Sequence, residues 1–137
     1  MKFLINESNE DIRRLYLAIF SPSDAEITFA ETAEDARFLA DLLRFDLVMI
    51  DVDFPDMEGL FIAREMIEER PDRPLLLISS VPLKQSDLGG GAAHSNIAFI
   101  MKPFNIHKLR GLIEDLAASK DPHASRALDH RIPALVH

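Results

Sequence analysis

Short apolar runs alternate along the chain with longer stretches in which apolar residues recur every three or four positions. Four of the runs are continuously apolar, which is typical of strands buried on both faces of a parallel sheet. A fifth, Ile27-Thr28-Phe29, alternates apolar and polar residues and indicates an edge strand. The alternation of strands with helices predicts a parallel α/β sheet. The predicted strands are residues 3–5, 27–29, 47–50, 75–78 and 97–101.

Apolar stripes at helical spacing fill the stretches between most of these runs. Arg13 and Arg14 should point outward from the first helix. Thr32 with Asp35 resembles a capping box at the start of the second, and Asn105 is a plausible N-cap of the last. The stripes are Ile12, Leu15, Tyr16 and Ile19; Ala36, Leu39 or Ala40, and Leu43; Leu60, Ala63, Met66 and Ile67; and Ile106, Leu109, Leu112, Ile113 and Leu116.

The fourth crossover, residues 80–96, is the exception. It contains Pro82 and the run Gly89-Gly90-Gly91, and each glycine costs a helix roughly 1 kcal/mol against alanine. We expect at most a short helix there, from Leu83 to Leu88. After residue 118 the apolar periodicity fades.

Composition narrows the class of protein. The chain has 137 residues, the usual size of one domain, and no apolar run approaches the length of a membrane span. It has no cysteine, which excludes disulfides and thiolate metal sites and is compatible with a cytoplasmic location. Its net charge of −8 repels phosphate backbones, so we expect no direct binding to nucleic acid. Because it has no apolar run of sufficient length, we also expect no membrane association.

Polar side chains follow the predicted strands at their carboxyl ends. In a doubly wound sheet, ligands bind beyond these ends, where the strand order reverses. Oxygen ligands there can hold Mg²⁺, a carboxylate can attack phosphorus to give an acyl phosphate, and a hydroxyl and an ammonium group can bind phosphoryl oxygens. The side chains expected at this edge are Glu7, Asp51, Asp53, Ser79, Ser80 and Lys102.

The order and spacing of these residues resemble the response-regulator receiver domains. Asp51, Pro55 and Gly59 match the D-x-x-x-P-x-x-x-G signature of that family. Ser79-Ser80 stands where the family has Thr or Ser followed by a small residue. Lys102-Pro103-Phe104 stands where it has K-P-F. The three motifs are in register with the predicted strands.

The resemblance covers residues 2–118 and implies the topology. We expect an α/β fold with a doubly wound, five-stranded parallel sheet of order 2-1-3-4-5, as in flavodoxin, flanked by five helices of which the fourth is short or irregular. Residues 1–118 would form the receiver domain, and residues 119–137 a loosely structured C-terminal tail.

The resemblance also assigns roles at the site. Asp51 would be the phosphoacceptor, and Glu7, Asp51 and the backbone carbonyl of Asp53 would bind Mg²⁺. Lys102 would bridge to the phosphoryl group, with a cis bond to Pro103. The protein would not be an enzyme in the ordinary sense, apart from weak self-phosphorylation and autodephosphorylation.

Signalling would depend on a switch pair and on protein partners. Ser79 would move toward the phosphoryl group, and Phe99 would be the coupled aromatic side chain. The implied partners are a histidine kinase or phosphotransfer protein upstream and an effector protein downstream, with a homodimer also possible. The face built by the fourth helix, fifth strand and fifth helix would carry the signal.

The acidic end of the first strand departs from the family. Receivers usually carry two adjacent acids there, whereas this chain has Glu7 with Ser8 or Asn6 beside it, so we expect weak Mg²⁺ binding. The Asp53 side chain could replace part of the missing charge or alter the lifetime of the acyl phosphate. Two alternatives stay open: an interaction module that signals without phosphorylation, and an aspartyl-phosphate hydrolase that uses Asp51 and Asp53.

Overall fold

The computed structural model describes residues 1–53, 58–89 and 96–118. The expectations for Pro55, Gly90, Gly91 and the tail 119–137 lie outside these residues. No helix in the described ranges is long and apolar enough to cross a membrane.

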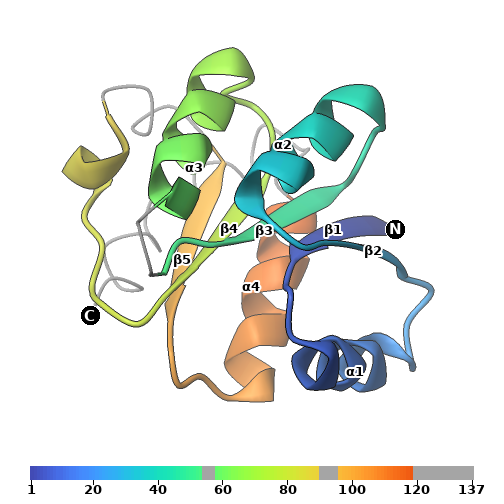
Figure 1. The fold of residues 1–137 in the computed structure, drawn as a ribbon. Coiled ribbons are helices and arrows are strands. Elements are labelled where there is room, and N and C mark those ends of the chain that lie inside the picture. Colours follow the sequence, from blue (N-terminus) through green and yellow to red (C-terminus); the bar gives the residue numbers. More distant parts are fainter. Residues whose placement is uncertain (54–57, 90–95, 119–137) are drawn as a thin grey trace.

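Five parallel strands form one sheet of order β2-β1-β3-β4-β5 (Figure 1). The order is the predicted one, and β2, the alternating run, lies at an edge as expected. The strands are β1 (Lys2–Asn6), β2 (Glu26–Ala30), β3 (Leu47–Asp51), β4 (Leu75–Ser79) and β5 (Ile97–Met101).

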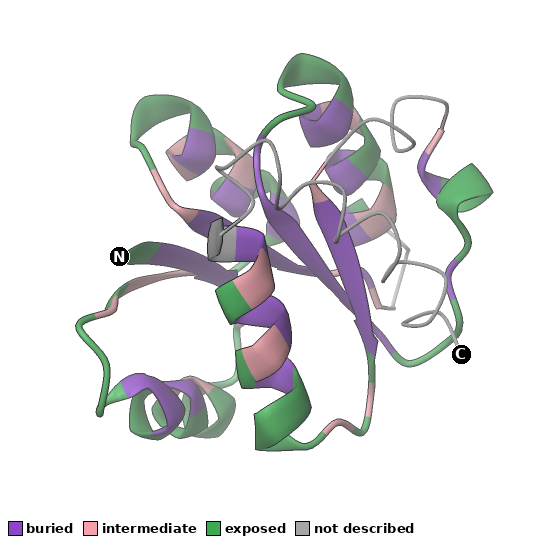
Figure 2. Cartoon of the chain, turned by 180° about the vertical axis from the view of Figure 1, so that it is seen from behind, coloured by how far each residue is buried: buried purple, intermediate pink, exposed green. Residues whose placement is uncertain are grey.

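Helices cover both faces of the sheet. Helices α2 (Ala33–Leu42) and α3 (Glu58–Glu69) lie on one face, and α1 (Glu10–Phe20) and α4 (Ile106–Ala118) lie on the other (Figure 1). Alternate residues of β3 explain this, because Val48 and Ile50 pack toward α2 and α3 while Leu47 and Met49 pack toward α1 and α4. Two cores therefore sandwich the sheet, and Figure 2 shows the central strands buried along most of their length.

The fourth crossover contains only a short 3₁₀ turn, η1 (Gln85–Leu88), within the span predicted for a short helix. The described residues thus hold four α-helices and this turn in place of five helices. Leu83 and Leu88 are buried and attach the segment to the core on the α2–α3 side. Gly89 ends the turn with a φ of +83°, a conformation that glycine adopts without strain.

The buried face of α1 differs from the predicted stripe. Tyr16, Ile19 and Phe20 are buried, whereas Ile12 and Leu15 are 40% and 55% exposed. The prediction that Arg13 points outward is wrong. Its guanidinium lies 5.3 Å from the centre of the Phe29 ring, and its Nε donates to the Glu7 carbonyl. Phe29 of the edge strand β2 is only partly buried, and the Arg13 guanidinium packs over its ring.

The N-caps predicted for two of the helices are confirmed. Thr32 Oγ1 accepts from the Asp35 backbone amide, and Asn105 Oδ1 accepts from the Lys108 amide. Leu43 does not belong to the buried stripe of α2, because it is the extended residue that follows the helix and is 55% exposed.

Candidate functional site

The acceptor aspartate predicted from the sequence, Asp51, ends the buried strand β3 at the carboxyl edge of the sheet. Its side chain is 23% exposed, so solvent reaches it at the rim of the sheet. Gly59 fixes how closely α3 approaches this point. A Cβ atom there would overlap the Asp51 carbonyl oxygen and lie 2.8 Å from Val52 Cα. The glycine of the motif is therefore needed for packing of α3 against the end of β3.

Lys102 brings the end of β5 to the same edge. Its backbone amide donates to the Ser79 carbonyl, which continues the pairing of β4 with β5. Its ammonium nitrogen lies 2.6 Å from Asp51 Oδ2. The bond from Lys102 to Pro103 is cis, as predicted. Two residues that are remote in the sequence thus form an ion pair in the predicted place.

The Asp53 side chain turns into the site. Its Oδ2 lies 3.1 Å from Lys102 Nζ and accepts from Ser80 Oγ at 2.6 Å, and its Oδ1 accepts from the Ser80 backbone amide at 2.7 Å. The Asp53 amide in turn donates to Asp51 Oδ1. Sequence reasoning gave Asp53 a carbonyl role and left the direction of its side chain open.

These contacts set the protonation states. Burial raises the pKa of the Asp53 carboxyl, but the hydrogen bonds from Ser80 and the charge of Lys102 outweigh burial, and the net pKa lies below its usual value. Burial lowers the pKa of Lys102, but its hydrogen bonds to Asp51 and Asp53 outweigh burial and raise the pKa above its usual value. Asp53 and Lys102 are therefore both charged at neutral pH.

Ser79 is buried, and its hydroxyl is hydrogen-bonded within its own loop. Its Oγ donates to the Val81 carbonyl at 2.7 Å and accepts from the Val81 amide at 3.1 Å. Phe99 is also buried, and the two side chains line one small cavity of about 10 Å³. The predicted switch pair is thus in contact with a common space, with the hydroxyl bonded to its own loop.

Glu7 lies near the site, at the end of β1. Its Oε2 accepts from the Asn9 amide, and Asn9 also caps α1 by accepting from two backbone amides, a role that the sequence analysis missed. Burial, followed by the negative charges of Glu7 and Asp51, raises the pKa of Tyr16. The pKa of this buried phenol of α1 therefore responds to both carboxylates.

The donor set suits Mg²⁺ in kind, because Glu7 and Asp51 offer carboxylate oxygens and Mg²⁺ is often held by one or two carboxylates with the remaining ligands from water or phosphate. No group of three or more His, Asp or Glu side chains in the described part of the chain could hold a metal ion. With so few carboxylates, the residues fit a Mg²⁺ ion whose remaining ligands come from water and a phosphoryl group.

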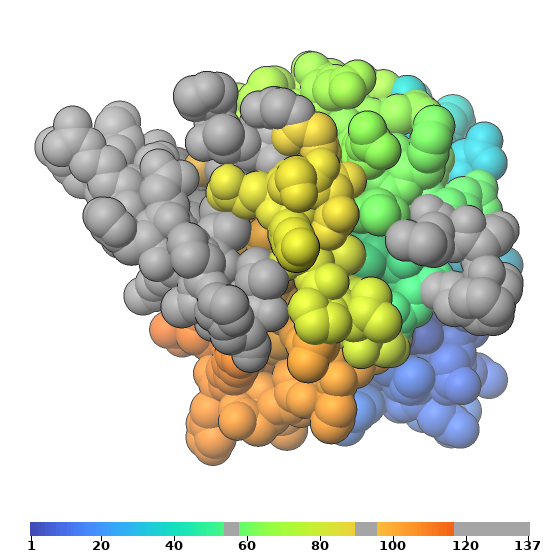
Figure 3. Space-filling model, turned by 90° about the vertical axis from the view of Figure 1, so that its left-hand side faces the viewer, coloured from blue at the N-terminus to red at the C-terminus, as the bar shows by residue number. Residues whose placement is uncertain are grey.

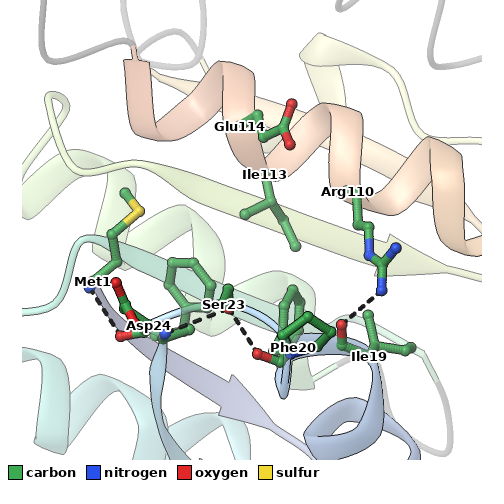
Figure 4. Close-up of a pocket in the computed structure, with 11 residues that line it drawn as sticks. Met1, Ile19, Phe20, Ser23, Asp24, Arg110, Ile113 and Glu114 are labelled. Carbon is green, nitrogen blue, oxygen red and sulfur yellow. Dashed lines mark hydrogen bonds between the residues drawn. The ribbon is translucent and has the colours of Figure 1, made fainter.

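A separate cavity of about 460 Å³ lies near the amino ends of β1 and β2 (Figure 4). Phe3, Phe20 and Ile113 give it an apolar wall, and Arg110 on its rim donates to the Ile19 carbonyl at 2.8 Å, tying α4 to α1. This cavity is at the end of the strands opposite Asp51, so it takes no part in the candidate site.

Known proteins are similar to this chain over most of its length. The family model described as the response regulator receiver domain matches residues 3–114. Transcriptional regulatory protein KdpE of Staphylococcus aureus is 29% identical over 86% of this chain and 52% of its own length. Response regulator protein PilR of Pseudomonas aeruginosa is 27% identical over 96% of this chain. The chain spans about half of KdpE and 29% of PilR.

Solved structures share the fold. The receiver domain of the Francisella response regulator 1452 has a TM-score of 0.72 at 20% identity, covering 88% of this chain and 98% of its own. The response regulator TrrA of Thermotoga maritima, in complex with Mg²⁺ and BeF, has a TM-score of 0.67 at 23% identity, covering 84% of this chain and 97% of its own. By the match over residues 3–114, and with Asp51, Gly59, Ser79 and Lys102 in register, this chain belongs to the response regulator receiver domain family.

Proposed function

We propose that this chain is a cytoplasmic, phosphorylation-dependent switch in which Asp51 accepts a phosphoryl group from the phosphohistidine of a histidine kinase or phosphotransfer protein. The observation that carries the proposal is the 2.6 Å contact between Lys102 Nζ and Asp51 Oδ2 at the carboxyl edge of the sheet. A structural role for that ion pair alone would not require Asp53 and Ser80 beside it.

The transfer exchanges one bond for another. An oxygen of the Asp51 carboxylate attacks phosphorus, the bond between phosphorus and the histidine nitrogen breaks, and that nitrogen keeps the electron pair and takes up a proton. Lys102 is already within hydrogen-bonding distance of Asp51, so its ammonium can bind a phosphoryl oxygen with little displacement. Holding the two groups in place before the reaction lowers the cost of organising them during it.

We propose Glu7, Asp51 and the backbone carbonyl of Asp53 as the residues that would hold Mg²⁺. When bound, Mg²⁺ neutralises charge on the phosphoryl oxygens. Support comes from two solved structures of similar fold: TrrA in complex with Mg²⁺ and BeF, and the receiver domain of sensor histidine kinase PA1611 from Pseudomonas aeruginosa, with magnesium coordinated in its active-site cleft. The single acid at the end of β1 favours weak binding in this chain.

The output of the switch would begin at Ser79. Its hydroxyl is bonded to Val81, so it must leave that carbonyl to reach a phosphoryl oxygen on Asp51. Because Ser79 and Phe99 border one cavity, movement of the hydroxyl changes the space available to the aromatic ring. This gives a physical route from the site to the surface around β5.

The signalling surface would be formed by η1, β5 and α4. Figure 3 shows residues 80–89 side by side with the β5 and α4 region on one face. Val81, Met101 and Ile106 are 55%, 38% and 42% exposed and belong to this region. Exposed apolar side chains next to the switch suit contact with an effector protein. The relatives include transcriptional regulators, but a specific effector for this chain stays a proposal.

The test is the mass of the intact protein after incubation with phosphoramidate and Mg²⁺. We expect one added phosphoryl group in the wild type and none in Asp51→Asn, whose spectra must show an intact fold. An unmodified wild type would favour the interaction module that signals without phosphorylation. Turnover of a phosphomonoester that depends on Asp51 and Asp53 would favour the hydrolase.

A further inference from the structure

The Asp53 carboxylate occupies the donors that surround the acceptor aspartate. One of its oxygens binds Lys102 Nζ and Ser80 Oγ, and the other binds the Ser80 amide. Ammonium, hydroxyl and backbone amide groups are the donors that bind phosphoryl oxygens in proteins. We name this set of contacts, the Asp53 carboxylate with Lys102 and with the amide and hydroxyl of Ser80, the Asp53 latch.

While the Asp53 latch contacts are formed, the negative charge of Asp53 disfavours a phosphoryl group on Asp51. Lys102 is the one cation that ion-pairs there in the described structure, and it faces both Asp51 and Asp53. An acyl phosphate on Asp51 carries about two negative charges at neutral pH, in place of the one charge of the free carboxylate. It would share Lys102 with the Asp53 carboxylate at short range, where like charges repel strongly because the side chains are partly buried.

The latch also restrains the loop that carries the switch hydroxyl. Ser80 is fixed at its backbone and its side chain, and Ser79 and Val81 are its chain neighbours. Ser79 Oγ is bonded to Val81 in the same conformation. Movement of Ser79 toward Asp51 therefore disturbs a segment that Asp53 holds by two hydrogen bonds.

We infer that the Asp53 carboxylate is an intramolecular anion that stands in the place of phosphoryl oxygens at Lys102 and Ser80, and that it must be displaced before Asp51 carries a phosphoryl group. The inference rests on the proposed function of Asp51. It assigns to Asp53 an autoinhibitory role at the site, separate from the metal contact proposed for its carbonyl.

The experiment measures the dissociation constant of beryllofluoride by NMR, with the full chain and with Mg²⁺ raised until the spectrum of each protein no longer changes. Asp53→Asn keeps the size of the side chain and removes its charge. We expect it to bind beryllofluoride about tenfold more tightly than the wild type, the effect of losing one charge-assisted competitor. If Asp53→Asn binds beryllofluoride and the wild type shows no binding, the inference is supported and the Asp53 carboxylate competes by more than tenfold.

Two further variants separate the latch from net charge. Ser80→Ala removes one hydrogen bond to Asp53 and no charge. Because it also removes a hydroxyl that would bind a phosphoryl oxygen, it should bind beryllofluoride less tightly than Asp53→Asn, in which both Ser80 donors stay. Glu68→Gln removes one negative charge from an exposed position of α3 and should leave the constant unchanged. Equal tightening by Glu68→Gln would assign the effect to overall charge and overturn the inference.

Failure of the inference is distinguishable from failure of the proposed function. Wild-type binding with an unchanged or weaker affinity in Asp53→Asn would overturn the latch and leave Asp51 as the acceptor. Absence of binding in the wild type and in all variants, with intact folds, would contradict the proposed function itself and the latch with it.

Discussion

Lys102 Nζ lies 2.6 Å from Asp51 Oδ2, although 51 positions separate the two residues in the chain. The contact exists because β3 and β5 are parallel strands on either side of β4, so that their carboxyl ends meet at one edge. It places an ammonium group where charge would collect on a phosphoryl group attached to Asp51.

Replacing Lys102 with alanine should slow acyl phosphate formation by about 100-fold, because a preorganised charged donor is lost. The rate is measured from the mass of the intact protein during incubation with phosphoramidate and Mg²⁺. Lys108→Ala, at an exposed position of α4, is the matched control and should react at the wild-type rate. If Lys102→Ala reacts as fast as the control, Lys102 does not assist acyl phosphate formation.

Gly59→Ala should destabilise the protein by about 3 kcal/mol, because the added Cβ meets the backbone at Asp51 and Val52, which cannot move without shifting β3. Gly111→Ala in α4 is the control, since no other atom lies within 4 Å of the added Cβ. It should stabilise the protein by about 0.5–1 kcal/mol, as alanine does in a helix. Urea unfolding gives both free energies, and equal effects of the two substitutions would contradict the packing described at Gly59.

Tyr16 is the one tyrosine of a chain without tryptophan, so its ionisation can be followed by ultraviolet absorbance. Burial and the charges of Glu7 and Asp51 raise its pKa, so phenolate should form only above the usual pKa of about 10. A raised pKa stabilises the fold below pH 10, and this contribution is lost as the pH rises through the folded value. Glu7→Gln and Asp51→Asn should each lower the midpoint, and a wild-type midpoint at the usual value would contradict the arrangement.

Acid should weaken the contacts of Asp53. Its pKa is lowered on folding, so its contribution to stability is present above the unfolded value of about 3.9 and is lost as the pH falls through the folded value. The difference in free energy of unfolding between wild type and Asp53→Asn should therefore shrink below pH 4. A difference that stays constant from pH 7 to pH 2 would show that the charge of Asp53 contributes nothing to the fold.

Much of the fold could be predicted because strands buried on both faces are continuously apolar and because Asp51, Ser79 and Lys102 stand at the ends of such runs. The pattern on α1 was less informative. Its apolar residues cover more than one face, and the buried ones, Tyr16, Ile19 and Phe20, are those that pack into the core with Phe3.

The side-chain directions at the site could not be predicted. Whether Asp53 faces solvent or Lys102 depends on the conformation after β3 and on the position of Ser80, two features that are remote in the sequence. Tyr16 had the spacing of an ordinary core residue, and its nearness to Glu7 and Asp51 follows from how α1 packs. Asn9 carries a recognisable N-cap signal in its residue type, which the sequence analysis passed over.

The most direct test of the switch is an NMR titration of the full chain with Mg²⁺ and beryllofluoride, with Asp51→Asn as the control. The account predicts that the signals of Asp51, Ser79 and Phe99 shift together in the wild type as the Ser79 hydroxyl leaves Val81, and that none shifts in the variant. Shifts confined to Asp51, with Ser79 and Phe99 unchanged, would contradict it.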